Sequence, residues 1–298
     1  MSPVPASPPP VDVFGTTFQN PILLAAGTAG FGRELAGVIN LDRLGGLTTK
    51  AVSPEPRSGH AAPRVAEFPG GMLNAVGLAN PGLEHVEAVE LPWLATRLRR
   101  ARVIVNVVGS VVADFEKVVQ RLSPLPVVTA LELNVSCPNT ARGGEEFGAD
   151  VAVLTELVRC CRGVSDKPLL VKLAPYLADI GAIASVAAEA GADGFTLVNT
   201  IPGTLFRCEG GGGGVRGPRL GFGRGGVSGP ALLPVGVWAT RRVRERTGLP
   251  VIGVGGVRTL EDVDQYLHAG ASLIAVGTAA LADPRVPERL VSQWSRRG

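Results

Sequence analysis

The 298-residue sequence has few cysteines, few aromatic residues and no long apolar run. Its four cysteines include the adjacent pair Cys160 and Cys161, and no two stand in a CxxC spacing. This pattern argues against a disulfide framework and against a zinc site, and we expect no bound metal. No stretch reaches the roughly 18 apolar residues that would predict a membrane span. The proline-rich residues 1–10 lack the apolar centre of a signal peptide. We expect a flexible N-terminus, then a single domain over 11–298 in the cytoplasm.

Charge is also nearly balanced, and this excludes another class of function. The formal net charge is only +3, too small for the electrostatic footprint of a nucleic-acid-binding protein. Apolar residues make up 45% of the chain, which is enough for a large core and excludes a disordered or collagen-like chain. The abundant residue is glycine, with 40 copies. So many glycines indicate tight turns, or backbone that approaches a ligand closely.

Eight short apolar runs alternate with helical patterns along the chain. They are too apolar for half-exposed antiparallel strands and are typical of buried parallel ones: residues 21–27, 46–52, 103–108, 128–135, 169–173, 194–199, 251–254 and 272–276. Between them, helices are predicted over 150–162 and 179–190, and a third begins at the capping residue Thr259 and stops at Gly270. The alternation predicts a (β/α)₈ TIM barrel, an α/β fold. A doubly wound open sheet is the alternative, disfavoured because no GxGxxG follows the first strand.

Two connections are much longer than the others. Residues 53–84 are rich in proline, and residues 201–229 contain the run Gly210–Gly214. Loops of this length inside a compact domain are usually functional lids or disordered segments. We expect both to be long loops beside the functional site.

Polar residues gather where the predicted strands end, and that end of a barrel carries the active site. Such residues follow or end six of the strands: Lys50, Asn106, Asn134, Lys172, Asn199 and Thr200, with Thr28 after the first. The seventh and eighth strands end instead in backbone-rich turns at Gly255, Gly256, Gly277 and Thr278. Phosphate sites in this fold commonly follow these two strands. Gly225–Gly229 could add further backbone donors, so a phosphorylated ligand is expected.

The two lysines in apolar strands require an anionic partner to stay charged. Glu132 is the one acidic residue near a neighbouring strand end, and we expect a ligand anion rather than Glu132 to pair with Lys50 and Lys172. A phosphorylated flavin fits, because its reduced ring carries negative charge that a fixed cation stabilises. The asparagines suit a planar imide or amide substrate. Cys137 is the only base or nucleophile at a strand end, and the histidines lie elsewhere.

At these positions the sequence resembles a known family. TTKAVSPEPRSG, GGMLNAVGLANPG, ELNVSCPN, VKLAP, GGVSGPA, GVGGV and VGTA occur in order between residues 48 and 279. They resemble the class 1 dihydroorotate dehydrogenases, FMN enzymes of pyrimidine synthesis with a TIM-barrel fold. The segment that begins EPRSGHAAPRVAEFPGG and the RGGEEFG after CPN are closest to the class 1B catalytic subunit.

The resemblance implies the oxidation of dihydroorotate to orotate, with Cys137 taking the C5 proton and hydride passing from C6 to flavin N5. The positions that match the family's substrate contacts are Lys50, Asn74, Ala75, Val76, Gly77, Leu78, Asn134, Asn139, Asn199 and Thr200. The positions that match its FMN contacts are Thr28, Lys50, Ala51, Asn106, Asn134, Lys172, Val198, Gly226, Gly255, Gly256, Gly277 and Thr278.

Class 1B enzymes also imply a partner. The resemblance predicts a catalytic homodimer flanked by two separate subunits that carry FAD and a 2Fe-2S cluster and pass electrons to NAD⁺. The sequence departs from the family at Tyr176, where asparagine is usual, and in the glycine-rich loop 209–226.

Three alternatives remain open at this point. The substrate could be another dihydropyrimidine, as in the flavin domain of dihydropyrimidine dehydrogenase, although histidine usually stands there in place of Asn139. The chain could be a non-catalytic FMN-binding paralogue. The electron acceptor could be fumarate or a quinone in place of NAD⁺.

Overall fold

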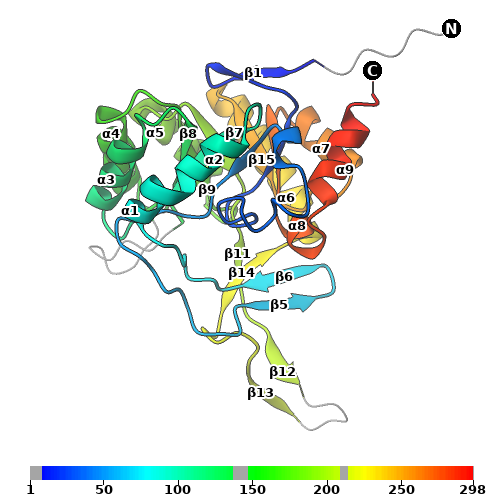
Figure 1. Cartoon of the computed structure of the whole chain (residues 1–298). Helices are drawn as coiled ribbons and strands as arrows, with labels where there is room; N and C mark the ends of the chain where they lie inside the picture. Colours follow the sequence, from blue (N-terminus) through cyan, green and yellow to red (C-terminus); the bar gives the residue numbers. More distant parts are fainter. Residues whose placement is uncertain (1–8, 137–146, 209–213, 298) are drawn as a thin grey trace, which may run out of the picture.

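The computed structural model describes residues 9–136, 147–208 and 214–297. Eight parallel strands close into a barrel, and each lies within or next to a predicted run (Figure 1). They are β3 (Ile22–Leu24), β4 (Gly46–Thr48), β7 (Arg102–Val107), β8 (Val128–Asn134), β9 (Leu169–Leu173), β10 (Gly194–Leu197), β15 (Val251–Val254) and β16 (Leu273–Val276). The predicted TIM barrel is confirmed, and the open-sheet alternative is excluded.

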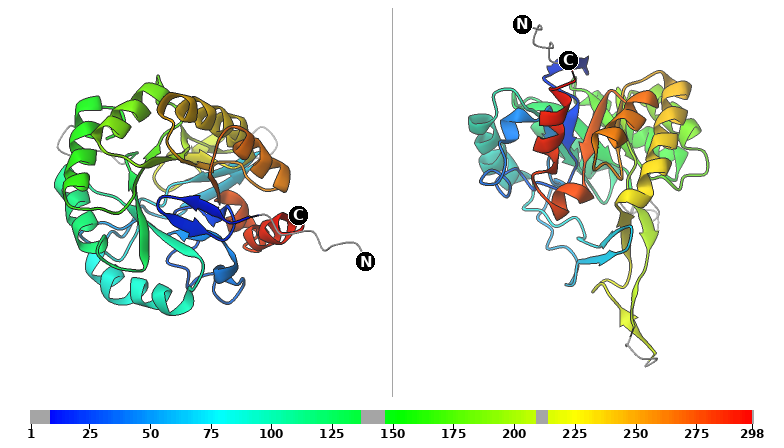
Figure 2. Two further views of the ribbon diagram at one scale, coloured as in Figure 1. Left: turned by 90° about the horizontal axis from the view of Figure 1, so that it is seen from above. Right: turned by 90° about the vertical axis from the view of Figure 1, so that its right-hand side faces the viewer.

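Helices surround the barrel as an outer ring (Figure 2, left). They are α1 (Leu83–His85), α2 (Leu91–Arg97), α3 (Val112–Leu122), α4 (Val151–Gly163), α5 (Ile180–Ala190), α6 (Leu233–Thr247), α7 (Leu260–His268), α8 (Thr278–Ala282) and α9 (Val286–Trp294). Shorter turns are η1 (Leu41–Arg43), the π-helical η2 (Val86–Glu90) and η5 (Pro230–Leu232). Asp150, Asp179 and Thr259 accept hydrogen bonds from the first-turn amides of α4, α5 and α7, so the predicted starts of these helices are confirmed.

The apolar core has two layers. The larger lies between the strands and the helices and includes Phe115, Phe147 and Phe195. The smaller fills the barrel and includes Leu23, Ile104, Ala130, Leu170, Ile252 and Leu273. An N-terminal hairpin that the sequence patterns did not predict, β1 (Val11–Val13) and β2 (Thr16–Phe18), adds Val13 and Phe18 to this interior cluster. The hairpin therefore closes one end of the barrel, and Figure 2 shows it across the centre of the helical ring.

The two long connections differ from the expected loops because they pair with each other. Residues 53–84 contain β5 (Val65–Phe68) and β6 (Gly71–Asn74), and residues 201–229 contain β11 (Ile201–Gly203) and β14 (Gly225–Ser228). These four strands form an antiparallel sheet in the order β11-β14-β6-β5, with Gly226 opposite Asn74, and we call it the added sheet. The strands β12 (Phe206–Cys208) and β13 (Val215–Pro218) pair and extend away from the barrel (Figure 1). Residues 1–8 of the N-terminal segment 1–10, which we expected to be flexible, lie outside the described residues, as do residues 209–213 of the glycine-rich loop.

Candidate functional site

The alternation of side chains along the strands places polar groups inside the barrel at one end. Ile104, Ala130 and Leu170 belong to the interior cluster. Because successive side chains of a strand point to opposite faces, the residues two positions further on share this interior face. These residues are Asn106, Glu132 and Lys172, with Asn134 following on the same face of β8. Asn106 is in register with Glu132, and Asn134 with Lys172, so four adjacent polar groups line the carboxyl end of the barrel.

Glu132 is the centre of a hydrogen-bonded network on this face. Its Oε1 accepts a hydrogen bond of 2.6 Å from Asn106 Nδ2, and its Oε2 accepts one of 2.7 Å from the Thr196 hydroxyl. Lys172 Nζ lies 3.7 Å from Glu132 Oε1, and both side chains are buried. The expectation that a ligand anion rather than Glu132 would pair with Lys172 is therefore wrong. Glu132 of β8 is in register with Leu170 of the neighbouring strand β9, and Lys172 follows two residues later on the same interior face.

Two further amides form a chain whose direction is fixed. The Thr200 backbone N–H donates to Asn199 Oδ1 at 2.9 Å, so the Asn199 amide nitrogen must face the other way. It donates to Asn134 Oδ1 at 3.2 Å. Asn134 Nδ2 is thus turned away from Asn199, and it has no protein acceptor within the described residues. It remains a donor for a ligand.

The β6–β14 pair brings predicted substrate residues next to this amide chain. Asn74 Nδ2 donates to the Gly226 carbonyl at 3.2 Å, and a Cβ on Gly226 would lie 2.1 Å from Thr200 Oγ1. After Asn74 the chain turns through Gly77 and Leu78, both with positive φ. Buried Asn80, which the sequence patterns did not single out, holds this turn by donating to Ser53 Oγ and to the Leu78 carbonyl, each at 2.8 Å. Gly226 is thus required where the added sheet meets the barrel.

The glycine-rich ends of β15 and β16 form the opposite side of the site. Gly255 and Gly256 both have positive φ, and the Gly255 carbonyl accepts a 2.8 Å hydrogen bond from the buried Tyr266 hydroxyl. Burial raises the pKa of Tyr266, which keeps this hydroxyl protonated as a donor. At the end of β16, Thr278 Oγ1 donates to Ser228 Oγ at 2.8 Å, which links α8 to β14. Side-chain hydrogen bonds therefore fix the backbone at the ends of β15 and β16.

The remaining predicted cofactor residues border these groups. A Cβ built on Gly277 would lie 4.0 Å from Thr28 Oγ1, and one on Gly255 would lie 3.6 Å from Val198 Cγ2. Lys50 and Ala51 follow β4, and the Lys50 amide donates to the Gly30 carbonyl at 2.7 Å. Within the described chain no carboxylate forms an ion pair with Lys50, so a ligand anion as its partner stays a prediction.

Two of the predicted residues cannot be placed. Cys137 and Asn139 lie outside the described residues. Ser136, directly before them, has a buried hydroxyl that finds no hydrogen-bond partner in the described part of the chain. Among the other cysteines, burial chiefly raises the pKa of Cys161 to about 12, with Cys160 and Glu116 adding to the shift. Cys161 is therefore a packing residue of α4 rather than a nucleophile.

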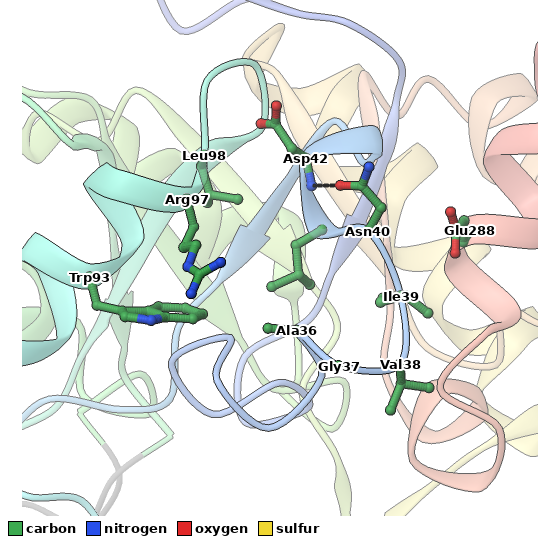
Figure 3. A pocket seen from close by; sticks show the side chains of 11 residues that line it. Ala36, Gly37, Val38, Ile39, Asn40, Asp42, Trp93, Arg97, Leu98 and Glu288 are labelled. Carbon is green, nitrogen blue, oxygen red and sulfur yellow. Dashed lines mark hydrogen bonds between the residues drawn. The ribbon is translucent and has the colours of Figure 1, made fainter.

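A surface hollow lies away from this site. It has a volume of about 410 Å³ and is lined by residues of the segment 36–42 together with Trp93, Arg97, Leu98 and Glu288 (Figure 3). None of the predicted site residues lines it. Over residues 9–136, 147–208 and 214–297, no group of three or more histidine, cysteine and acidic side chains could hold a metal ion. In the same ranges no helix is long and apolar enough to cross a membrane.

Comparison with known proteins gives consistent matches. A family model described as dihydroorotate dehydrogenase matches residues 10–297. A relative from Listeria monocytogenes serotype 4b (strain CLIP80459) is 44% identical over 287 residues, which are 96% of this chain and 92% of the relative. Relatives from Anoxybacillus flavithermus and Geobacillus kaustophilus are each 44% identical, over 95% of this chain and 88% of their own. All three are named dihydroorotate dehydrogenase B (NAD(+)), catalytic subunit.

Proposed function

Because this chain belongs to the dihydroorotate dehydrogenase family, we propose that it is the catalytic subunit of an NAD-linked enzyme that oxidises dihydroorotate to orotate in pyrimidine synthesis. The observation that carries the proposal is the set of asparagines and lysines at the carboxyl end of the barrel, in a chain that matches the family along almost its whole length. This set supplies directed amide donors and acceptors and two cations. It suits a planar, anionic pyrimidine better than a sugar phosphate.

The residues present also fit FMN. Lys50 and Lys172 offer positive charge, and the turns after β15 and β16 offer the backbone N–H groups of Gly255, Gly256 and Gly277, with Thr28 near Gly277, as a phosphate requires. The residues proposed to hold the cofactor are Thr28, Lys50, Ala51, Asn106, Asn134, Lys172, Val198, Gly226, Gly255, Gly256, Gly277 and Thr278. When bound, FMN supplies the acceptor for the hydride that leaves C6 of the substrate.

The protein's own groups orient the substrate and move its proton. The direction of the Thr200–Asn199–Asn134 chain leaves Asn134 Nδ2 as a donor toward a substrate carbonyl or carboxylate. Asn74–Leu78, Asn139 and Lys50 complete the proposed contacts. Cys137 is proposed as the base that takes the C5 proton. A free thiol has a pKa near 8.5, so activity is expected to rise in mildly alkaline solution.

A partner subunit is part of the same proposal. The names of the relatives describe a catalytic subunit, and this supports a second subunit that accepts the electrons. We place FAD and the 2Fe-2S cluster on that subunit, two copies of which flank a catalytic homodimer in the cytoplasm. With only four cysteines, two of them adjacent in α4, this chain is poorly suited to hold such a cluster itself.

Substitution of Cys137 tests the proposed activity. Purified Cys137→Ala is expected to retain yellow FMN but to lose flavin reduction by dihydroorotate by several orders of magnitude at neutral pH, because the base is gone. The measurement is anaerobic stopped-flow bleaching of FMN. Cys208→Ala removes an exposed thiol on β12 and serves as the matched control with normal bleaching.

The same assay separates the alternatives. Near-normal bleaching of Cys137→Ala would contradict the assignment of the base. Bleaching by dihydrouracil and not by dihydroorotate would replace the substrate. Wild-type protein that binds FMN and is bleached by neither would be a non-catalytic paralogue. Adding a candidate electron-transfer subunit and NAD⁺, against fumarate or a quinone alone, then identifies the acceptor.

A further inference from the structure

The barrel interior contains one carboxylate that the family resemblance does not include among the site residues. Glu132 of β8 is 1% exposed and lies between Asn106 of β7, Lys172 of β9 and Thr196 of β10. Two of these partners, Asn106 and Lys172, are among the residues proposed to hold FMN. Glu132 therefore contacts two of the proposed cofactor residues without being one of them.

The charge of Glu132 has an effect beyond hydrogen bonding. A buried carboxylate is costly, and an apolar replacement of a whole buried ion pair is often neutral for stability. Fold stability alone therefore does not explain why the carboxylate is there. Its position 3.7 Å from Lys172 Nζ makes the two side chains a neutral pair in a region of low dielectric, where charges act strongly.

We propose that Glu132 is a positioning residue of the flavin site, which holds the Lys172 ammonium in a neutral pair and so lowers the midpoint potential of the bound flavin. This inference rests on the proposed function, because it requires FMN at this end of the barrel. A lone cation would stabilise the negative charge of the reduced ring. The neighbouring carboxylate offsets part of that stabilisation and makes the flavin a better electron donor to the partner subunit.

The substitution Glu132→Gln changes the charge while preserving shape. The glutamine oxygen can accept from Asn106 Nδ2, and its amide nitrogen can donate to the Thr196 hydroxyl, which rotates to accept. The ratio of reduced to oxidised FMN at a fixed reference potential is expected to rise at least about tenfold, which is about 30 mV for a two-electron couple. The measurement is a spectroelectrochemical titration of the FMN-loaded protein.

A second buried carboxylate provides the matched control. Glu90 is 9% exposed in η2 and pairs with Arg33 at 2.8 Å and with His85 at 3.2 Å, in the outer layer of the molecule. Glu90→Gln also removes a buried negative charge, so it carries a similar cost in stability. It is expected to leave the flavin potential unchanged. An unchanged or lowered potential in Glu132→Gln, or an equal rise in both variants, would overturn the proposal.

If Glu132→Gln does not fold, a second comparison decides the point. Lys172→Met alone and Lys172→Met with Glu132→Gln differ only in the carboxylate, and the double variant leaves no buried charge unpaired. The double variant is expected to have the higher potential, and equal potentials would overturn the proposal. Wild-type protein that fails to bind FMN would instead refute the proposed function, so the two failures are distinguishable.

Discussion

At the scale of single residues, two fixed amides determine which atoms the barrel offers a ligand. An ionised carboxylate only accepts hydrogen bonds, so Asn106 must turn its nitrogen toward Glu132 and its oxygen away. Asn134 is fixed in the opposite sense, because its oxygen already accepts from Asn199. One amide thus presents an acceptor and the other a donor. A ring that carries both N–H and C=O groups satisfies this arrangement.

Tyr266 fixes one wall of the site through a single hydrogen bond. Its buried hydroxyl donates to the Gly255 carbonyl at 2.8 Å, on the turn where Gly255 and Gly256 expose their backbone. Tyr266→Phe leaves this carbonyl without its donor, so we expect a loss of about 1 kcal/mol in unfolding free energy and a higher dissociation constant for FMN. Chemical denaturation and fluorescence titration of FMN measure the two effects.

The control for Tyr266 is Trp238→Phe. Trp238 is half-exposed on α6, and its replacement alters an aromatic ring without touching the turn. If Tyr266→Phe bound FMN as tightly as Trp238→Phe, the hydroxyl would be part of the core alone and not of the cofactor wall.

At the scale of elements, glycines set how closely a helix approaches the barrel. A Cβ on Gly236 of α6 would lie 2.0 Å from the Tyr266 hydroxyl and 3.1 Å from the Val254 carbonyl. Neither neighbour can move easily, because one is a buried aromatic ring and the other is strand backbone. Gly236→Ala is therefore expected to lower the unfolding free energy by about 3 kcal/mol, despite the better helix propensity of alanine.

Gly163, the last residue of α4, is the matched glycine. Nothing lies within 4 Å of a Cβ built there. Gly163→Ala is expected to change the unfolding free energy by less than about 0.5 kcal/mol. Urea denaturation of both variants gives the comparison. Equal stability of the two alanine variants would contradict the close packing of α6.

Two contacts between segments far apart along the chain are what the sequence patterns could not predict. Barrel strands and helix starts were predictable, because apolar runs and capping residues such as Asp150 and Thr259 are local signals. The sheet over the barrel mouth depends on Gly226 pairing with Asn74, far apart along the chain. The partner of Lys172 depends likewise on the register between β8 and β9. Neither leaves a periodic signal within one segment.

At the scale of the whole molecule, three carboxylates on outer elements link stability to pH. Burial acts to raise the pKa of Asp42, but the backbone amides of Ala101, Arg100 and Arg99 outweigh it, and the pKa is lowered. A hydrogen bond from Arg297 lowers the pKa of Asp264. The hydrogen bond from Arg289, followed by the Arg285 amide, lowers the pKa of Asp283 to about 2. Asp42 and Asp264 each bond to a segment distant in sequence, whereas Asp283 bonds to the nearby Arg285 and Arg289.

These shifts fix the direction of the acid dependence. A carboxyl whose pKa is lower in the folded than in the unfolded state stabilises the fold fully above its unfolded pKa, here 3.8. That stability is lost as the pH falls through the folded pKa. We therefore expect the urea midpoint of the wild-type protein to be level above about pH 5 and to fall between about pH 4 and pH 2.

Asp42 allows this link to be tested in one residue. Its Oδ1 accepts hydrogen bonds from the amides of Arg99 and Arg100 at 2.8 Å and of Ala101 at 3.0 Å, which hold the chain that leads into β7. Asp42→Ala is expected to cost about 2 kcal/mol at pH 7, since three amides lose a charged acceptor. It should also weaken the acid dependence, because the variant has one fewer carboxyl to protonate. Urea midpoints at about pH 7 and pH 3 measure both effects.

Glu67→Ala, on β5 of the added sheet, is the control for the loss of a carboxyl. If the urea midpoint fell equally between about pH 7 and pH 3 in Asp42→Ala and in the wild type, the Asp42 carboxylate would not couple folding to pH.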